Sequence, residues 1–387
     1  MTTVRLGIIG FGAQGSSYAR FLADGRVRDL VVTAVADVDP AREAAAAALA
    51  PGASFHADHR SLLASGEVDA VVVCTPHYLH PGIGIDALEH GLHVLVDKPA
   101  GVYAAQVAEL NEAAAAHPGQ RFAIMFNQRA NPLYRRLKEV VDEGGIGRIL
   151  RSNWIITTWW RPQAYFDQSA WRATWGGEGG GVLVNQAPHQ LDLWQWLCGV
   201  PESVVAKAGY GRCRDIAVED EVTVLADFGG GTTGVLVTTT HDPIGTDRLE
   251  IIGDRGRIVV DDSRVATITR LNAPEREVSA ALSAEDVGLL LGGRYDTADL
   301  STTERIESAS VWGEQHTAVL QDFADSILHG TPLLAPGAEG ILGVRLANAI
   351  HYSSWTGREV PLDLDEGVFL AALNERIREE GAFPERS

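Results

Sequence analysis

Short apolar runs alternate with helical stretches along the first third of the chain. The apolar runs predict strands at 4–9, 31–36, 70–73, 93–96 and 121–125, and the stretches between them predict helices at 16–23, 40–49, 81–90 and 104–116. Strands that are apolar without interruption and separated by helices are typical of a parallel sheet covered on both faces. The pattern therefore predicts a doubly wound α/β domain over residues 1–126.

A different pattern begins near residue 127. One helix is predicted at 132–143, and strands separated by turn signals then dominate, at 150–158, 204–208, 222–228, 233–240, 248–252 and 257–260. Their hairpin-sized spacing predicts a largely antiparallel sheet. Further helices are predicted at 182–197, 315–328 and 337–353, and the weakly periodic segment 272–303 predicts a long loop or excursion. Because 387 residues exceed what one core usually serves, residues 127–387 are expected to form a second domain.

Charge and cysteine content narrow the classes of partner. The chain has 51 acidic and 32 basic residues and a net charge of -19, which disfavours nucleic acid and anionic membranes as partners. Its three cysteines, Cys74, Cys198 and Cys213, offer no disulfide framework. No apolar run approaches the roughly 20 residues that span a bilayer, and no secretion signal precedes the first predicted strand. We therefore expect a cytoplasmic protein.

A glycine-rich turn joins the first predicted strand to the first predicted helix. Its G-x-G-x-x-G sequence consists of Gly10, Phe11, Gly12, Ala13, Gln14 and Gly15. In this context the first glycine permits a tight turn, the second lets a pyrophosphate approach the backbone, and the third lets helix and strand pack closely. The free N–H groups of the helix N-terminus then face the phosphates. The turn predicts a dinucleotide site.

Asp37 ends the second predicted strand, 22 positions after Gly15. A carboxylate there can accept hydrogen bonds from the ribose hydroxyls and would repel a 2′-phosphate, so the sequence favours NAD over NADP. Two alternatives stay open. In the first, Asp37 only caps the next helix. In the second, Arg42 lets the site tolerate a 2′-phosphate, so that the preference for NAD is not absolute.

Three further segments make the chain resemble the glucose–fructose oxidoreductase and inositol dehydrogenase family, Gfo/Idh/MocA. They are C-T-P-H-Y-L-H at 74–80, G-L-H-V-L-V-D-K-P at 91–99 and G-G-G-V-L-V-N-Q-A-P-H-Q-L-D at 179–192, and residues 347–358 are similar to the family's closing helix and strand. The resemblance implies an α/β Rossmann domain followed by an α+β domain with a large, mostly antiparallel open sheet. It also implies a nicotinamide cofactor, a sugar or polyol substrate, and a homodimer or homotetramer formed through the open sheet.

Lys98 matches the family's catalytic lysine, and the adjacent Pro99 is often cis in this family. Asp97 stands where a glutamate is usual. At the end of a parallel strand, an ammonium can polarise the reacting oxygen and lower the pKa of a neighbouring acid. On the cofactor side the resembling segments supply Thr75, Pro76, His80, Asp97 and Lys98.

His189 matches the family's acid–base histidine. Asn185, His189 and Asp192 are spaced i, i+4 and i+7, so one face of the predicted helix is expected to carry all three. Asn185 departs from the aspartate found in many relatives, so the imidazolium would lack a carboxylate partner and the pKa of His189 would be lower. Either Lys98 then carries more of the proton transfer, or Asn185 mainly binds a substrate hydroxyl. Asp192 is expected to be structural.

Aromatic side chains are concentrated around the third segment, since seven of the nine tryptophans lie between 154 and 196. Aromatic faces pack well against sugar rings, and their N–H and O–H groups bind hydroxyls. The expected substrate contacts are Asn127, Arg129, Trp160, Tyr165, Trp175, Asn185, Gln186 and His189. An aromatic core or a subunit interface explains the tryptophans equally well, and the histidine spacing predicts no metal site.

These residues favour reversible hydride transfer between NAD and a secondary alcohol of a sugar, glycoside or cyclitol. A second hypothesis is an NAD-dependent glycosidase that eliminates an aglycone after transient oxidation, with no net redox change. A third is a regulator that binds NAD without catalysis, against which the presence of both Lys98 and His189 argues.

Overall fold

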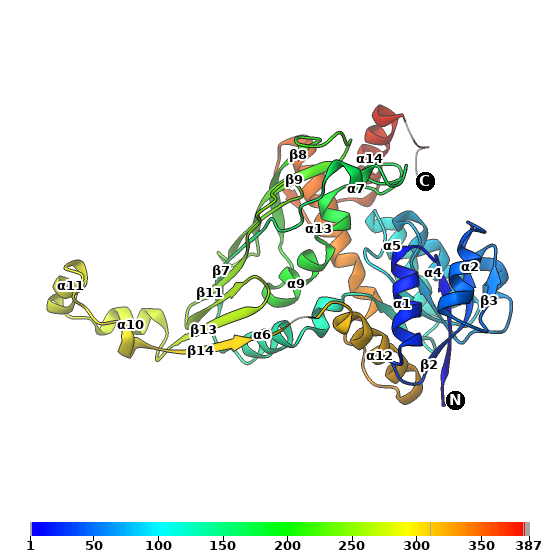
Figure 1. Cartoon of the computed structure of the whole chain (residues 1–387). Coiled ribbons are helices and arrows are strands. Elements are labelled where there is room, and N and C mark those ends of the chain that lie inside the picture. The colour runs from blue at the N-terminus through cyan, green and yellow to red at the C-terminus, as the bar shows by residue number, and fades with distance from the viewer. Residues whose placement is uncertain (1, 310, 382, 384–387) are drawn as a thin grey trace.

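The first half of the computed structural model is built on a six-stranded parallel sheet (Figure 1), and the structure describes residues 2–309, 311–381 and 383. The strand order is β3-β2-β1-β4-β5-β6. The strands are β1 (Val4–Ile9), β2 (Leu30–Ala36), β3 (Ser54–His56), β4 (Ala70–Val73), β5 (His93–Val96) and β6 (Phe122–Ile124). The helices are α1 (Ala13–Ala23), α2 (Arg42–Leu49), α3 (His59–Leu63), α4 (His80–Glu89) and α5 (Ala104–Ala116), with short turns η1 (His77–Leu79) and η2 (Asn127–Ala130). This confirms the predicted Rossmann domain.

Unbroken apolar strands arise here because both faces of the sheet are covered. Ile8 and Val72 belong to one buried cluster, whereas their neighbours Ile9 and Val71 belong to another on the opposite face. Since successive side chains of a strand point to opposite faces, every position of a central strand must be apolar.

The second half is built on a nine-stranded sheet in the order β14-β13-β12-β11-β7-β10-β9-β8-β15. The strands are β7 (Ile149–Ile156), β8 (Ser203–Tyr210), β9 (Glu219–Asp227), β10 (Thr233–Thr239), β11 (Asp247–Gly253), β12 (Gly256–Asp261), β13 (Val265–Leu271), β14 (Ser301–Glu307) and β15 (Val360–Pro361). The β7–β10 pair is parallel and the other pairs are antiparallel. The mostly antiparallel open sheet is therefore confirmed.

Helices cover the face of this sheet that is turned toward the Rossmann domain (Figure 1). They are α6 (Pro132–Asp142), α9 (Pro188–Cys198) and α13 (Gly340–Thr356), and two further helices, α7 (Gln163–Phe166) and α14 (Glu366–Glu380), lie near one end of the sheet. Trp194 of α9 and Ile350 of α13 share one buried cluster with Trp154 and Leu236 of the sheet.

The single helix predicted at 182–197 is wrong, because the structure has two helices, α8 (Val182–Asn185) and α9. Pro188 is the first residue of α9. A proline has no N–H to donate, and its ring collides with the carbonyl four residues back, so α8 cannot continue through it. Asn185 therefore ends one helix while His189 begins the next, and the shared face expected for Asn185, His189 and Asp192 does not exist.

The segment 272–303, predicted as a long loop or excursion, contains two short helices that extend away from the body of the molecule (Figure 1). These are α10 (Glu275–Ala281) and α11 (Ala284–Leu291), followed by η3 (Ala298–Leu300) and the start of β14. Neither helix has a buried residue. The excursion is confirmed, but its helices were missed because they show no apolar face turned to a core.

Helix α12 (Glu314–His329) follows the large sheet in sequence but packs against the Rossmann domain. Val319, Leu320 and Phe323 belong to the same buried cluster as Ile8 of β1. The backbone N–H of Arg28 also donates to Oε1 of Gln321, at 2.8 Å. The two domains are therefore joined by the chain connection at residue 127 and also by α12, which follows the large sheet in sequence but packs on the Rossmann domain.

Candidate active site

The backbone at Gly10 and Gly15 leaves no room for a side chain, and Gly12 faces open space. Gly10 has φ +90°, and a Cβ there would lie 2.8 Å from the carbonyl carbon of Cys74. A Cβ on Gly15 would lie 2.2 Å from the carbonyl oxygen of Gly10, so only glycine lets α1 pack this closely. A Cβ on Gly12 would meet nothing within 4 Å. No side chain caps α1, which leaves its first N–H groups free for an anion.

Asp37 is held at the end of β2 beside this turn. Its Oδ2 accepts a hydrogen bond from the backbone N–H of Phe11 at 2.6 Å, and its Oδ1 accepts one from Asp39 at 2.9 Å. Asp37 therefore does not cap α2, whose N-cap is Ala41 and has no side-chain bond. The side chain of Phe11 is fully buried, so this residue offers the site its backbone.

One cleft joins the glycine turn to the end of β5 and to the aromatic loop. Its volume is about 610 Å³, which lies within the roughly 300–1,000 Å³ that is typical of small-molecule and cofactor pockets. The predicted cofactor residues that line it are Gly10, Gly12, Ala13, Gln14, Asp37, Thr75, Pro76, His80, Asp97 and Lys98. The buried hydroxyl of Thr75 has no partner among the described residues, as expected of a group that meets a ligand.

His80 fixes the loop after β4 to the turn after β5. Its Nδ1 lies 2.8 Å from the carbonyl oxygen of Pro99, and its Nε2 lies 2.6 Å from that of Thr75. Burial lowers the pKa of His80 below its usual value. His80 lines the cleft and bridges two of its loops, and its cofactor contact stays a prediction.

Lys98 follows directly after β5, and its peptide bond to Pro99 is cis, as the resemblance implied. The Nζ atom donates a hydrogen bond to the backbone carbonyl oxygen of Asn185 at 2.6 Å. Burial lowers the pKa of Lys98, although the nearby carboxylates of Asp97 and Glu178 act to raise it. A lysine with a lowered pKa gives up its proton more readily than a solvated lysine does.

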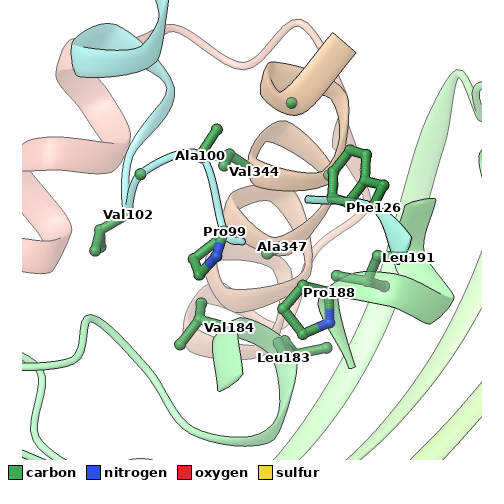
Figure 2. A pocket seen from close by; sticks show the side chains of 13 residues that line it. Pro99, Ala100, Val102, Phe126, Leu183, Val184, Pro188, Leu191, Val344 and Ala347 are labelled. Carbon is green, nitrogen blue, oxygen red and sulfur yellow. The ribbon is translucent and has the colours of Figure 1, made fainter. Parts of the chain in front are cut away.

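Apolar contacts hold the Lys98 turn against the second domain. Figure 2 shows the side chains of Pro99, Val184, Pro188 and Ala347 gathered around a small apolar hollow. These residues come from the turn after β5, from α8, from α9 and from α13. The contact places Lys98 of the first domain next to the break between α8 and α9, where Asn185 and His189 lie.

His189 is partly exposed at the start of α9, and its Nδ1 has no hydrogen-bond partner among the described residues. Burial, and then the charges of Lys98 and His316, lower the pKa of His189 well below its usual value. The direction is the one expected, but its causes are burial and neighbouring positive charge rather than the identity of residue 185. The described contacts of Asn185, however, run to Glu178 and Lys98 and not to the imidazole.

Glu178 is a buried acid in this site that the sequence analysis missed. It is 1% exposed, its Oε2 accepts a hydrogen bond from the backbone N–H of Ala173 at 2.7 Å, and its Oε1 accepts one from Nδ2 of Asn185. Burial raises the pKa of Glu178 to about 7. The available signal was its position directly before the three glycines 179–181, since a charged side chain next to a buried turn needs a specific partner.

The aromatic wall of the cleft consists of Tyr165 and Trp171, together with the cation of Arg172. The guanidinium of Arg172 lies over both rings, at 4.9 and 4.8 Å from their centroids, and its Nη1 donates to the Tyr165 hydroxyl at 3.0 Å. Tyr165 and Asn185 are thus the predicted substrate residues that line this cleft.

Two predicted substrate tryptophans lie elsewhere. Trp175 is buried against the rings of His351 and Trp355, at 5.2 and 5.3 Å, so it belongs to an aromatic core, which was the alternative reading. Trp160 is 45% exposed and is not among the described residues that line the cleft.

The expected substrate contacts at the domain junction are engaged in other bonds. Arg129 is buried, with Nε and Nη2 donating to Asp192 at 2.9 and 2.6 Å and Nη1 donating to Glu339 at 2.5 Å. This supports the structural role expected for Asp192 and argues against substrate binding by Arg129. Asn127 lies next to His316 of α12, with Nδ2 2.9 Å from the ring Nε2, and Gln186 is buried.

Among residues 2–309, 311–381 and 383, no three histidine, cysteine or acidic side chains are grouped so as to hold a metal ion. Over the same residues, no helix has the length and apolar character required to cross a membrane.

Comparison with known proteins assigns both halves of the chain. Residues 4–125 match the sequence model described as "Oxidoreductase family, NAD-binding Rossmann fold", and residues 134–259 match the GFO/IDH/MocA C-terminal domain. Inositol 2-dehydrogenase 2 of Saccharopolyspora erythraea is 31% identical over 286 residues, which are 68% of this chain and 80% of that protein. Inositol 2-dehydrogenase of Burkholderia multivorans is 32% identical over 282 residues, 71% of this chain and 79% of that protein.

Solved structures of similar fold cover nearly the whole chain. The WlbA dehydrogenase of Chromobacterium violaceum, in complex with NADH and UDP-GlcNAcA, has a TM-score of 0.77 and 26% identity, and the match covers 94% of this chain and 97% of that one. Levoglucosan dehydrogenase in complex with NADH and levoglucosan has a TM-score of 0.78, covers 93% of this chain and all of that one, and at 22% identity supports the fold alone. With its NAD-binding Rossmann domain and its matching C-terminal domain, the chain belongs to the Gfo/Idh/MocA family of oxidoreductases.

Proposed function

We propose that this oxidoreductase transfers a hydride between NAD and a secondary alcohol of a sugar, a glycoside or a cyclitol. The observation that carries the proposal is the position of Lys98. Its amine lies in the same cleft as the glycine turn and bonds to the backbone of Asn185, so the proton-accepting group stands where the cofactor side meets the second domain.

The residues of the cleft fit NAD. The open space at Gly12, the uncapped α1 and the unpartnered hydroxyl of Thr75 suit a dinucleotide phosphate, and the carboxylate of Asp37 suits an unphosphorylated ribose. When bound, the nicotinamide ring supplies the hydride acceptor or donor.

Lys98 is the proposed proton acceptor during alcohol oxidation. Its lowered pKa favours the neutral amine more than in a solvated lysine, and the carbonyl oxygen of Asn185 stabilises the ammonium after proton transfer. His189 is less suited to store the proton, because its lowered pKa disfavours the imidazolium. Its proposed role is to bind the reacting oxygen as a neutral imidazole and to assist the transfer.

A polyhydroxylated ring suits the second part of the cleft. Tyr165 and Trp171 offer aromatic faces for the C–H side of such a ring, and Asn185 and Arg172 offer polar groups for its hydroxyls. Relatives in the family that are named as inositol 2-dehydrogenases support this class of substrate.

The test is NADH absorbance with purified protein, NAD and a panel of inositols, free sugars and aryl glycosides, with aglycone release recorded in the same wells. We expect NADH formation that falls at least about 100-fold in Lys98→Met and in His189→Ala. Lys138→Met is the control, because Lys138 lies on α6, does not line the cleft and pairs with Asp142. Aglycone release without accumulation of NADH would contradict the proposal and favour the redox-cycling glycosidase.

We also propose that the chain forms a homodimer or homotetramer through the uncovered face of the large sheet. Ile155, Val205 and Leu225 of strands β7, β8 and β9 are 43%, 44% and 53% exposed on that face. Apolar side chains exposed on a broad sheet are suited to burial between subunits. Sedimentation of the wild type and of Leu225→Arg tests this, with dissociation expected in the variant.

A further inference from the structure

Glu178 is placed where it controls both neighbours that the proposed reaction uses. It lies on the glycine-rich turn before α8, seven residues ahead of Asn185. Its side chain is almost completely buried, yet it carries a group that can ionise. Burying a carboxylate is costly, so such a group is expected to have a specific set of partners.

The bonds of Glu178 determine how the Asn185 amide is oriented. Because Nδ2 of Asn185 donates to Glu178, Oδ1 of Asn185 is the end of the amide that is left to accept a hydrogen bond from another group. Above its pKa of about 7, Glu178 is an ionised carboxylate, which can only accept hydrogen bonds and so excludes the flipped amide. Glu178 thereby presents a hydrogen-bond acceptor on the side chain of a residue that lines the cleft.

Glu178 also acts on Lys98 through its charge. The Nζ atom of Lys98 bonds to the backbone oxygen of the residue that Glu178 holds by its side chain. The other charged or titratable groups that face Glu178 are Arg172, whose Nη1 is 3.7 Å from Oε1, and His77, whose Nδ1 is 3.1 Å from the Glu178 carbonyl oxygen. Burial lowers the pKa of His77 well below its usual value, so the neighbouring cations are Arg172 and Lys98.

We propose that Glu178 is a positioning residue, which fixes the Asn185 amide with Oδ1 free and supplies the negative charge that balances Lys98 once its amine has taken the substrate proton. This rests on the proposed function, in which Lys98 is the proton acceptor. In this proposal Glu178 supplies the carboxylate that Asn185, which stands where many relatives have aspartate, does not provide. The proton passes from the substrate hydroxyl to the neutral Lys98 amine, and the hydride passes to NAD from the carbon that bears this hydroxyl, so charge and atoms balance.

The first test measures the Lys98 amine directly and needs no activity. The chain has only three lysines, Lys98, Lys138 and Lys207, so reductive 13C-methylation gives a simple NMR spectrum, assigned with Lys98→Arg. Loss of the Glu178 charge should lower the Lys98 titration midpoint by about one pH unit in Glu178→Gln, since a neighbouring opposite charge shifts a pKa by 1–3 units. Lys138 and Lys207 should titrate unchanged. An unshifted Lys98 midpoint would overturn the proposal.

A matched control separates charge from loop structure. Glu380 accepts hydrogen bonds from the backbone N–H groups of Trp175 and Gly176, both at 3.1 Å, and so supports the same loop from outside the cleft. Glu380→Gln is expected to leave the Lys98 midpoint where it is. A shift as large as that of Glu178→Gln would show that loop distortion, not the Glu178 charge, moves the midpoint, and would also overturn the proposal.

The second test measures activity in a variant in which the negative charge is moved from residue 178 to residue 185. In the double variant Glu178→Gln/Asn185→Asp, the amide and the carboxylate exchange places, so both the hydrogen bond and the negative charge remain. The rising limb of kcat/KM against pH should move to lower pH in Glu178→Gln and return in the double variant. A limb that stays in place in the single variant refutes the positioning role. Failure of every alcohol to yield NADH would refute the proposed function, while the NMR titration would still decide the charge coupling.

Discussion

The buried ion pair between Arg129 and Asp192 permits a quantitative prediction. If the pair binds substrate, its removal should raise KM, whereas if it is structural, its removal should lower the free energy of unfolding. Arg129 of η2 and Asp192 of α9 are joined by two hydrogen bonds, and their side chains are 3% and 5% exposed. Removing one partner from such a pair costs about 3–5 kcal/mol, since the other charge stays buried. Asp192→Asn should lower the free energy of unfolding by about 3 kcal/mol, at the lower end of this range. Arg129 would still pair with Glu339 and lie 5.4 Å from the Phe126 ring.

The assay is urea denaturation followed by tryptophan fluorescence, together with the KM of the substrate. In the double variant Arg129→Met/Asp192→Leu, apolar side chains of similar size replace both charges, and we expect most of the lost stability to return. KM should change less than threefold in either variant. The reasoning is refuted if Asp192→Asn keeps the wild-type urea midpoint while KM rises tenfold or more, because that result would make the pair part of the substrate site.

Three further predictions concern the cofactor turn and Glu178. Asp37→Ser should lower the Kd of NADP by about tenfold or more, since it removes a charge that faces the 2′-phosphate; an unchanged NADP affinity by fluorescence titration would contradict this. Gly15→Ala should cost about 1–3 kcal/mol of unfolding free energy and weaken NAD binding, since its Cβ meets the Gly10 carbonyl; wild-type values for both would disprove it. Burial raises the pKa of Glu178 from 4.5 to about 7, so the folded state favours the protonated acid. Wild-type stability relative to Glu178→Gln should therefore fall by about 3 kcal/mol as pH rises from about 4.5 to 7, and a difference that is flat with pH would exclude the raised value.

The parts of the site that sequence could predict are those with a local physical signal. The glycine turn is such a case, because the strand before it and the helix after it can both be recognised from their own patterns. Lys98 was identified differently, by its match to the family's catalytic lysine, and its place after an apolar strand was a supporting argument. Asp37 was placed correctly, although its hydrogen bond to the Phe11 backbone depends on the packed fold.

The parts that sequence could not predict depend on contacts between distant segments. Nothing near Trp175 distinguishes a sugar-binding ring from one that packs against Trp355, 180 residues later. The role of Glu178 likewise depends on where Lys98 and Asn185 meet. Strand β14 was missed because its residues lie at the edge of the sheet and are half-buried or exposed, which removes the apolar alternation. The break at Pro188 was visible in the sequence, and the expected helix ignored it.

The return of α12 to the Rossmann domain has a consequence for how the protein is made. Residues 4–126 leave the ribosome long before Val319, Leu320 and Phe323, which complete one of the two clusters on their sheet. Until then the surface around Ile8 and Tyr18 lacks its covering helix and exposes apolar side chains to water. The nucleotide-binding half therefore finishes folding only after the large sheet has been synthesised, and a truncated chain that ends near residue 126 should aggregate unless α12 is supplied.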